Sequence, residues 1–87
     1  MATKVVMPPL GDSSDEAKVL RWLKQVGDSV QKGDTLLEIE TDKATVEIDA
    51  YGTGILRKII VPEGETVAVG VTLGVIAVAD EDISAFG

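Results

Sequence analysis

Residues 27–36 read GDSVQKGDTL, and residues 64–73 repeat the pattern as GETVAVGVTL. The register continues outward on both sides, where Val19 matches Leu56 and Ile39 matches Ile76. Two copies are too few for a solenoid. The repeat therefore predicts one small domain built from two similar halves, related by a pseudo-twofold axis.

Within each half, the residues alternate as they do in strands. In residues 44–50 the even positions are apolar and the odd positions polar, and residues 37–40 alternate in the same way. A period of two is typical of a half-buried strand. Glycines divide the chain at the spacing expected of turns: Gly27, Gly33, Gly52, Gly54, Gly64 and Gly70. We expect an all-β domain of two small antiparallel sheets.

Residues 15–25 offer the one serious alternative, a helix, because they contain good helix-forming residues. The repeat argues against it. The matching segment, residues 54–62, is rich in β-branched residues and is bounded by Gly54 and Pro62, which is typical of a strand. We expect residues 15–25 to form a strand as well.

Composition restricts the function. The chain has 87 residues, a net charge of −7, and neither Cys nor His. Thiolate chemistry, a His-based catalytic pair and a zinc site of the usual N/S ligands are excluded, and a metal site is not expected. The negative charge disfavours nucleic acid. Glu47 and Asp49 could be imagined as an acid and base pair, but their strand face implies no pocket.

The first residues do not resemble a signal or transit peptide, and the longest uncharged run, residues 66–79, is too short to span a membrane. We expect a soluble, monomeric domain, either intact or part of a longer chain.

Lys43 lies between the two best alternating segments, in the sequence Glu40-Thr41-Asp42-Lys43-Ala44. Asp42 and Lys43 suit the centre of a type I turn, so Lys43 is expected at a hairpin tip with its ammonium group in solvent. It is the only basic residue between Glu38 and Asp49. The repeat puts Asp80 at the equivalent position of the second half. A plain solvated turn lysine is the alternative interpretation.

The pentapeptide resembles the attachment motif of lipoyl domains, the carriers in the acyltransferase components of 2-oxo acid dehydrogenase complexes. Met7-Pro8, Arg21-Trp22-Leu23, residues 26–30, Gly33-Asp34 and residues 59–64 extend the resemblance over nearly the whole chain. It implies a flattened β-barrel of two four-stranded sheets over residues 1–80, with residues 81–87 as a linker or tail in which Phe86 could cover the barrel end. It also implies lipoic acid bound covalently to Lys43, with Glu40, Asp42 and Ala44 as flanking recognition residues.

The same resemblance implies partners and a place in the cell. The arm would visit a thiamine-diphosphate-dependent decarboxylase, an acyltransferase site and dihydrolipoamide dehydrogenase, after loading by lipoate ligase or a lipoyl transferase. The domain alone would be a non-catalytic carrier within a dihydrolipoamide acetyltransferase, most similar to the pyruvate type. It would be cytoplasmic in a bacterium, or in the mitochondrial matrix for a processed eukaryotic domain. The loop that helps the decarboxylase recognise the domain would comprise Leu10, Gly11, Asp12, Ser13, Ser14, Asp15 and Glu16.

Three other classes remain open at this point. Biotinyl carriers share the fold but usually set the lysine between two Met residues, whereas Asp42 and Ala44 flank Lys43. The glycine-cleavage carrier is typically longer than 87 residues. A purely structural domain would explain the repeat without a carrier role. One departure from the lipoyl pattern is Ala17, where the family commonly has glycine, and we expect slight backbone strain there.

Overall fold

The computed structural model describes residues 2–10, 15–80 and 83, and every regular element in these ranges is a β-strand. The predicted all-β class is confirmed, as is the strand within residues 15–25. The strands are β1 (Thr3–Val6), β2 (Glu16–Trp22), β3 (Ser29–Val30), β4 (Thr35–Glu40), β5 (Thr45–Asp49), β6 (Gly54–Ile59), β7 (Thr66–Ala68) and β8 (Thr72–Ala77).

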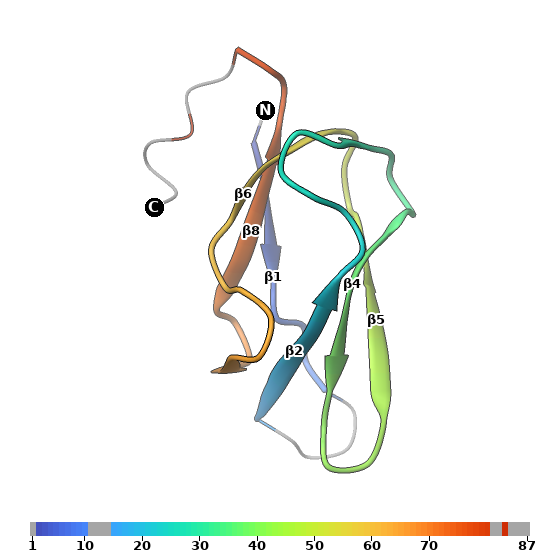
Figure 1. Ribbon diagram of the computed structural model, residues 1–87, viewed down its shortest axis with the longest axis vertical. Coiled ribbons are helices and arrows are strands. Elements are labelled where there is room, and N and C mark those ends of the chain that lie inside the picture. The colour runs from blue at the N-terminus through green and yellow to red at the C-terminus, as the bar shows by residue number, and fades with distance from the viewer. Residues whose placement is uncertain (1, 11–14, 81–82, 84–87) are drawn as a thin grey trace.

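The strands form two four-stranded antiparallel sheets, one in the order β1-β8-β6-β3 and the other in the order β5-β4-β2-β7 (Figure 1). The repeat equates β4 with β8, β2 with β6 and β3 with β7, and these strands hold matching places in the two sheets. The pseudo-twofold arrangement is therefore confirmed. It also equates β5 with β1, although β5 follows its hairpin neighbour β4 while β1 comes from the start of the chain.

The turns of one half bind to the strands of the other. Gly27 donates its N–H to the carbonyl of Leu56 at 2.8 Å, and the matching Gly64 donates to Val19 at 2.8 Å. Both glycines have positive φ, 100° and 93°, a conformation that glycine adopts without steric penalty. The repeated turn sequence therefore fixes the contact between the halves. Gly33 and Gly70 also have positive φ, whereas Gly54 lies within β6 rather than in a turn.

The core lies between the two sheets and consists only of apolar side chains among the described residues. The side chains of β4 and β5 that were predicted to face inward do so: Leu37 and Ile39 are fully buried, Ile48 is buried and Val46 is half-buried. Alternation alone does not explain Leu36, which is buried beside Leu37. The pairing of β4 with β5 shifts register between Thr35 and Leu37, and such a bulge turns two successive side chains towards the core.

Ala17 does not show the strain expected of it. It lies in the extended strand β2, pairs with Val67 and is 2% exposed within the core. Its matching residue, Gly54, has less room, because a Cβ there would lie 3.1 Å from the carbonyl oxygen of Ala77. Position 54 is therefore more crowded than position 17, which already holds a methyl group.

The molecule is elongated, with extents of 39 × 23 × 20 Å. The hairpin between β4 and β5 lies at one end, and the segment that follows β8 lies at the other (Figure 1). Asp80 is in that segment, at a turn. Of the predicted linker at 81–87, only Ile83 is among the described residues. Phe86 lies outside them. No helix in the described ranges could cross a membrane.

Candidate functional site

The candidate site is the hairpin that joins β4 to β5. The last ladder pair is Glu40 with Thr45, and beyond it the N–H of Thr41 donates to the carbonyl of Ala44 at 2.9 Å. Asp42 and Lys43 are therefore the two residues of the loop itself. Both are exposed, as is Ala44. The predicted position of Lys43 at a hairpin tip is confirmed.

The closure of this loop differs from the type I turn that the sequence suggests. Such a turn is commonly closed by the N–H of the fourth residue donating to the carbonyl of the first. Here the N–H of Ala44 donates to the side-chain oxygen Oγ1 of Thr41 at 3.2 Å, and the N–H of Lys43 donates to the same oxygen at 3.2 Å. The signal in the sequence is a Thr two residues before Lys43, at the end of the first alternating segment.

The Lys43 side chain is presented to solvent without a partner in the described part of the chain: its Nζ makes no hydrogen bond or ion pair there. Lys24 provides a contrast, because its Nζ lies 3.8 Å from Oδ2 of Asp34. An unpaired ammonium at a hairpin tip is accessible to a second protein, and its four-carbon stem is flexible. This is the geometry needed by an acceptor of a covalent group.

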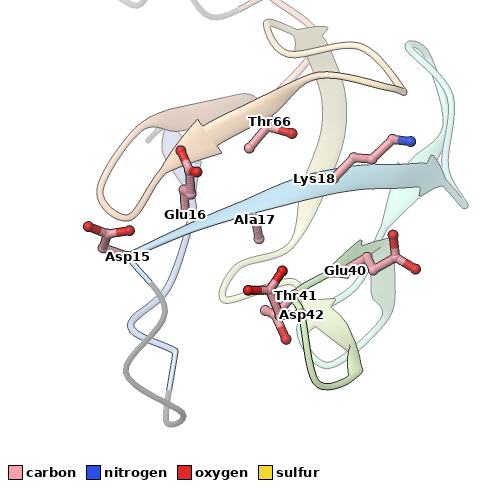
Figure 2. A pocket seen from close by; sticks show the side chains of 8 residues that line it. All are labelled: Asp15, Glu16, Ala17, Lys18, Glu40, Thr41, Asp42 and Thr66. Carbon is pink, nitrogen blue, oxygen red and sulfur yellow. The ribbon is translucent and has the colours of Figure 1, made fainter.

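An acidic cavity of about 350 Å³ lies beside the hairpin. Figure 2 shows the start of β2 on one side of it and the end of β4 with Thr41 and Asp42 on the other. We call it the acidic hollow; its lining residues are Asp15, Glu16, Ala17, Lys18, Glu40, Thr41, Asp42 and Thr66. Four of these carry carboxylates and one, Lys18, carries an ammonium group. The hollow therefore has a net negative charge next to the tip that bears Lys43.

Apart from Ala44, which is exposed in the hairpin, the predicted recognition residues divide into three groups. Asp15 and Glu16 are exposed and line the acidic hollow, and so do Glu40 and Asp42 of the hairpin. Leu10 is half-buried and packs against the core. Gly11, Asp12, Ser13 and Ser14 lie outside the described residues.

Lys18 and Thr66 were missed by the sequence reasoning. They reach the hollow because Lys18 pairs with Glu40 on one side and with Thr66 on the other. That pairing joins segments far apart in the chain, and no local pattern indicates it.

Glu47 and Asp49 lie on the outward face of β5. They are exposed, and Glu47 lies opposite Glu38 in the ladder while Oδ1 of Asp49 accepts a hydrogen bond from Thr35 at 3.1 Å. Neither residue lines the acidic hollow. Among the described residues, no group of acidic side chains could hold a metal ion.

Comparison with known proteins extends this description. Residues 3–76 match the biotin/lipoyl family model, described as "Biotin-requiring enzyme". The lipoyl domain of the dihydrolipoyl succinyltransferase of Escherichia coli is 35% identical with a TM-score of 0.73, and the match covers 92% of this chain and 100% of that domain. The chain belongs to the lipoyl domain family.

Two longer relatives contain a region similar to this lipoyl domain. The acetyltransferase component of the pyruvate dehydrogenase complex of Zymomonas mobilis is 47% identical over 85 residues, which is 97% of this chain and 19% of that protein. The succinyltransferase component of the 2-oxoglutarate dehydrogenase complex of Staphylococcus saprophyticus is 44% identical over 73 residues, which is 84% of this chain and 17% of that protein. This lipoyl domain thus spans about a fifth of the length of these relatives.

Proposed function

We propose that this lipoyl domain carries lipoic acid on Nζ of Lys43, as part of a dihydrolipoyllysine-residue acetyltransferase that acts on pyruvate-derived acetyl groups. The observation that carries the proposal is the placement of Lys43, exposed and unpaired among the described residues, at the tip of a two-residue hairpin in a domain of this family. The pyruvate type is favoured over the 2-oxoglutarate type by the greater identity and coverage of the acetyltransferase relative.

The chemistry of loading needs only an accessible amine from this chain. The Lys43 amine attacks the acyl carbon of lipoyl-adenylate, which a lipoate ligase forms from lipoic acid and ATP. A C–N amide bond forms, AMP leaves and a proton passes to solvent. When bound, lipoic acid supplies a dithiolane that accepts an acyl group and two electrons, so the chemistry belongs to the cofactor and the protein presents it.

The shape of the domain suits a carrier. The hairpin lies at one end of a molecule 39 Å long, and the segment after β8 leaves from the other end (Figure 1). A group attached to Lys43 therefore points away from the polypeptide that would tether the domain. Such a tether raises the effective concentration of the arm at each partner site. We expect those partners to be a thiamine-diphosphate-dependent decarboxylase and dihydrolipoamide dehydrogenase.

The test of this proposal is modification of the unmodified chain by purified ligases. We expect lipoate ligase with lipoic acid and ATP to add one lipoyl group, mapped by peptide mass spectrometry to Lys43. Biotin ligase with biotin and ATP serves as the parallel arm, because the family also includes biotin-requiring enzymes. A biotin adduct on Lys43, or a lipoyl group on another lysine, would contradict the proposal.

The acidic hollow is expected to assist the encounter with the decarboxylase. Replacing Asp15 and Glu16 with Asn and Gln removes two of its carboxylates. Since charge complementarity acts mainly on the association rate, we predict that reductive acetylation by the decarboxylase slows by about threefold at low salt, with a smaller effect at high salt.

The matched control replaces Glu47 and Asp80, two exposed acidic residues that do not line the hollow, with the same amides. The two double variants have the same net charge. Equal rates for both would show that the hollow has no specific part in the encounter.

A further inference from the structure

The hydroxyl group of Thr41 makes three hydrogen bonds within the hairpin. Its oxygen accepts the N–H of Lys43 and the N–H of Ala44, both at 3.2 Å, and the hydroxyl donates to the carbonyl of Ala44 at 3.2 Å. A hydroxyl can donate once and accept twice. Thr41 is half-buried, so water competes less for these bonds than it would at a fully exposed side chain. The backbone amides of Lys43 and of the next residue, Ala44, are thus both bound to the same side-chain oxygen.

The loop needs this help because its own residues do not favour a tight hairpin. Two-residue hairpin loops prefer sequences such as Asn-Gly, Asp-Gly or Gly-Gly. Asp42 and Lys43 occupy these positions here. One backbone bond across the loop runs from Thr41 N–H to Ala44 O, at 2.9 Å. The amides of Lys43 and Ala44 are held by the Thr41 hydroxyl instead.

The second half of the repeat provides an internal comparison. The residue that matches Thr41 is Val78, which has no hydroxyl group, and the residue that matches Lys43 is Asp80. Val78 is 49% exposed, and a turn at residues 79 and 80 follows it. The strands that precede Thr41 and Val78, β4 and β8, hold equivalent places in their sheets. The hydroxyl group nevertheless occurs only at position 41, in the half that presents the lysine.

We propose that Thr41 is a positioning residue for the modification of Lys43. Its hydroxyl fixes the backbone of Lys43 and thereby the direction in which the lysine stem leaves the hairpin, so that a lipoate ligase meets an ordered tip. This inference rests on the proposed function, since it concerns the same lysine. Without the hydroxyl, the ligase must order the loop itself as it binds, and that ordering reduces the apparent affinity.

The test compares Thr41→Val, which keeps the shape and removes the hydroxyl, with Thr41→Ser, which keeps the hydroxyl. We expect kcat/KM for lipoylation of Thr41→Val to fall on the order of 10-fold, mainly through KM, because misplacement of a reacting group by about 1 Å can reduce a rate by 10²-fold. Thr41→Ser should modify at close to the wild-type rate. Thr45→Val is the matched control, since Thr45 is an exposed residue at the start of β5 and contributes no side-chain hydrogen bond among those described.

Amide hydrogen exchange, followed by NMR on the unmodified chain, gives a readout that general destabilisation would not reproduce. In Thr41→Val the amides of Lys43 and Ala44 should exchange faster, while those of Leu37 and Ile48 keep their wild-type rates. Faster exchange across all four amides, or a slower lipoylation without any change at Lys43 and Ala44, would overturn the positioning role. So would an unchanged rate of lipoylation in Thr41→Val.

Two further results separate this inference from the proposed function. If the wild-type chain takes no lipoyl group on Lys43, the proposed function fails and the positioning role fails with it. If the wild type is modified and Thr41→Ser is as slow as Thr41→Val, the proposed function stands and the hydroxyl is not the cause. Thr41→Ser also keeps the test decisive should the valine variant fold poorly.

Discussion

Lys43→Arg is expected to reduce lipoylation of the chain to below detection. Arginine keeps the positive charge and most of the length of the side chain, but its guanidinium group stays protonated and has no free electron pair for attack on an acyl group. The hairpin should be unaffected, because the structure shows only the backbone N–H of Lys43 in its hydrogen bonds. Intact mass after incubation with lipoate ligase measures the result directly, and thermal unfolding should give a wild-type Tm.

Lys32→Arg is the matched control. Lys32 is also an exposed turn lysine, and its backbone N–H also bonds to a threonine hydroxyl, that of Thr53, at 3.2 Å. We expect this variant to accept one lipoyl group at the wild-type rate. Lipoylation that persists in Lys43→Arg, or that is lost in Lys32→Arg, would show that another lysine is the acceptor.

The features that the sequence predicted correctly are those encoded by local pattern. Alternation in residues 44–50 gave β5 its inward Ile48 and outward Glu47, and the glycines at 27, 33, 64 and 70 marked turns of positive φ. The repeat then supplied the symmetry, because identical spacing of turns and strands leads to equivalent places in two sheets. A hairpin tip at Lys43 followed from the two strands on either side of it.

The features that escaped prediction depend on contacts between distant segments or on the role of one atom. Burial of both Leu36 and Leu37 results from a register shift against β5, which a period-two pattern cannot show. Lys18 joins the acidic hollow because β2 is paired on both sides, with β4 and β7. The amide of Ala44 donates to the hydroxyl of Thr41 instead of to its carbonyl. The residue types in the loop do not show which of these two oxygens is the acceptor.

The two halves also differ inside the core. Leu37 in β4 matches Gly74 in β8, and both are buried. A Cβ on Gly74 would lie 2.7 Å from the carbonyl oxygen of Lys58 and 3.0 Å from the ring carbon Cη2 of Trp22. The indole occupies the space that a side chain at position 74 would need, and its Nε1 donates to the carbonyl of Val61 at 2.9 Å. The backbones of the two halves therefore match, but their core side chains differ. The space that a side chain at position 74 would fill is taken by the ring of Trp22, which comes from the first half.

Gly74→Ala is therefore expected to destabilise the domain by about 2 kcal/mol, because a methyl group forced into a filled site moves the backbone or its neighbours. Roughly 8–16 °C would be lost from the Tm of a domain of this size. Urea unfolding measures the free energy, and lipoylation of Lys43 at temperatures well below the Tm should be unchanged, since the change lies in the other sheet.

Gly54→Ala is the control for this prediction. Its new Cβ would lie 3.1 Å from the Ala77 carbonyl oxygen and 3.1 Å from Cγ2 of Ile76, a smaller overlap than at Gly74. Alanine also restricts the unfolded chain, which stabilises the fold by about 0.4–1 kcal/mol at compatible sites. We expect Gly54→Ala to stay within about 1 kcal/mol of the wild type. The equivalent Ala17 already carries a buried methyl group. A greater loss at Gly54 than at Gly74 would contradict the prediction that position 74 is the more crowded of the two.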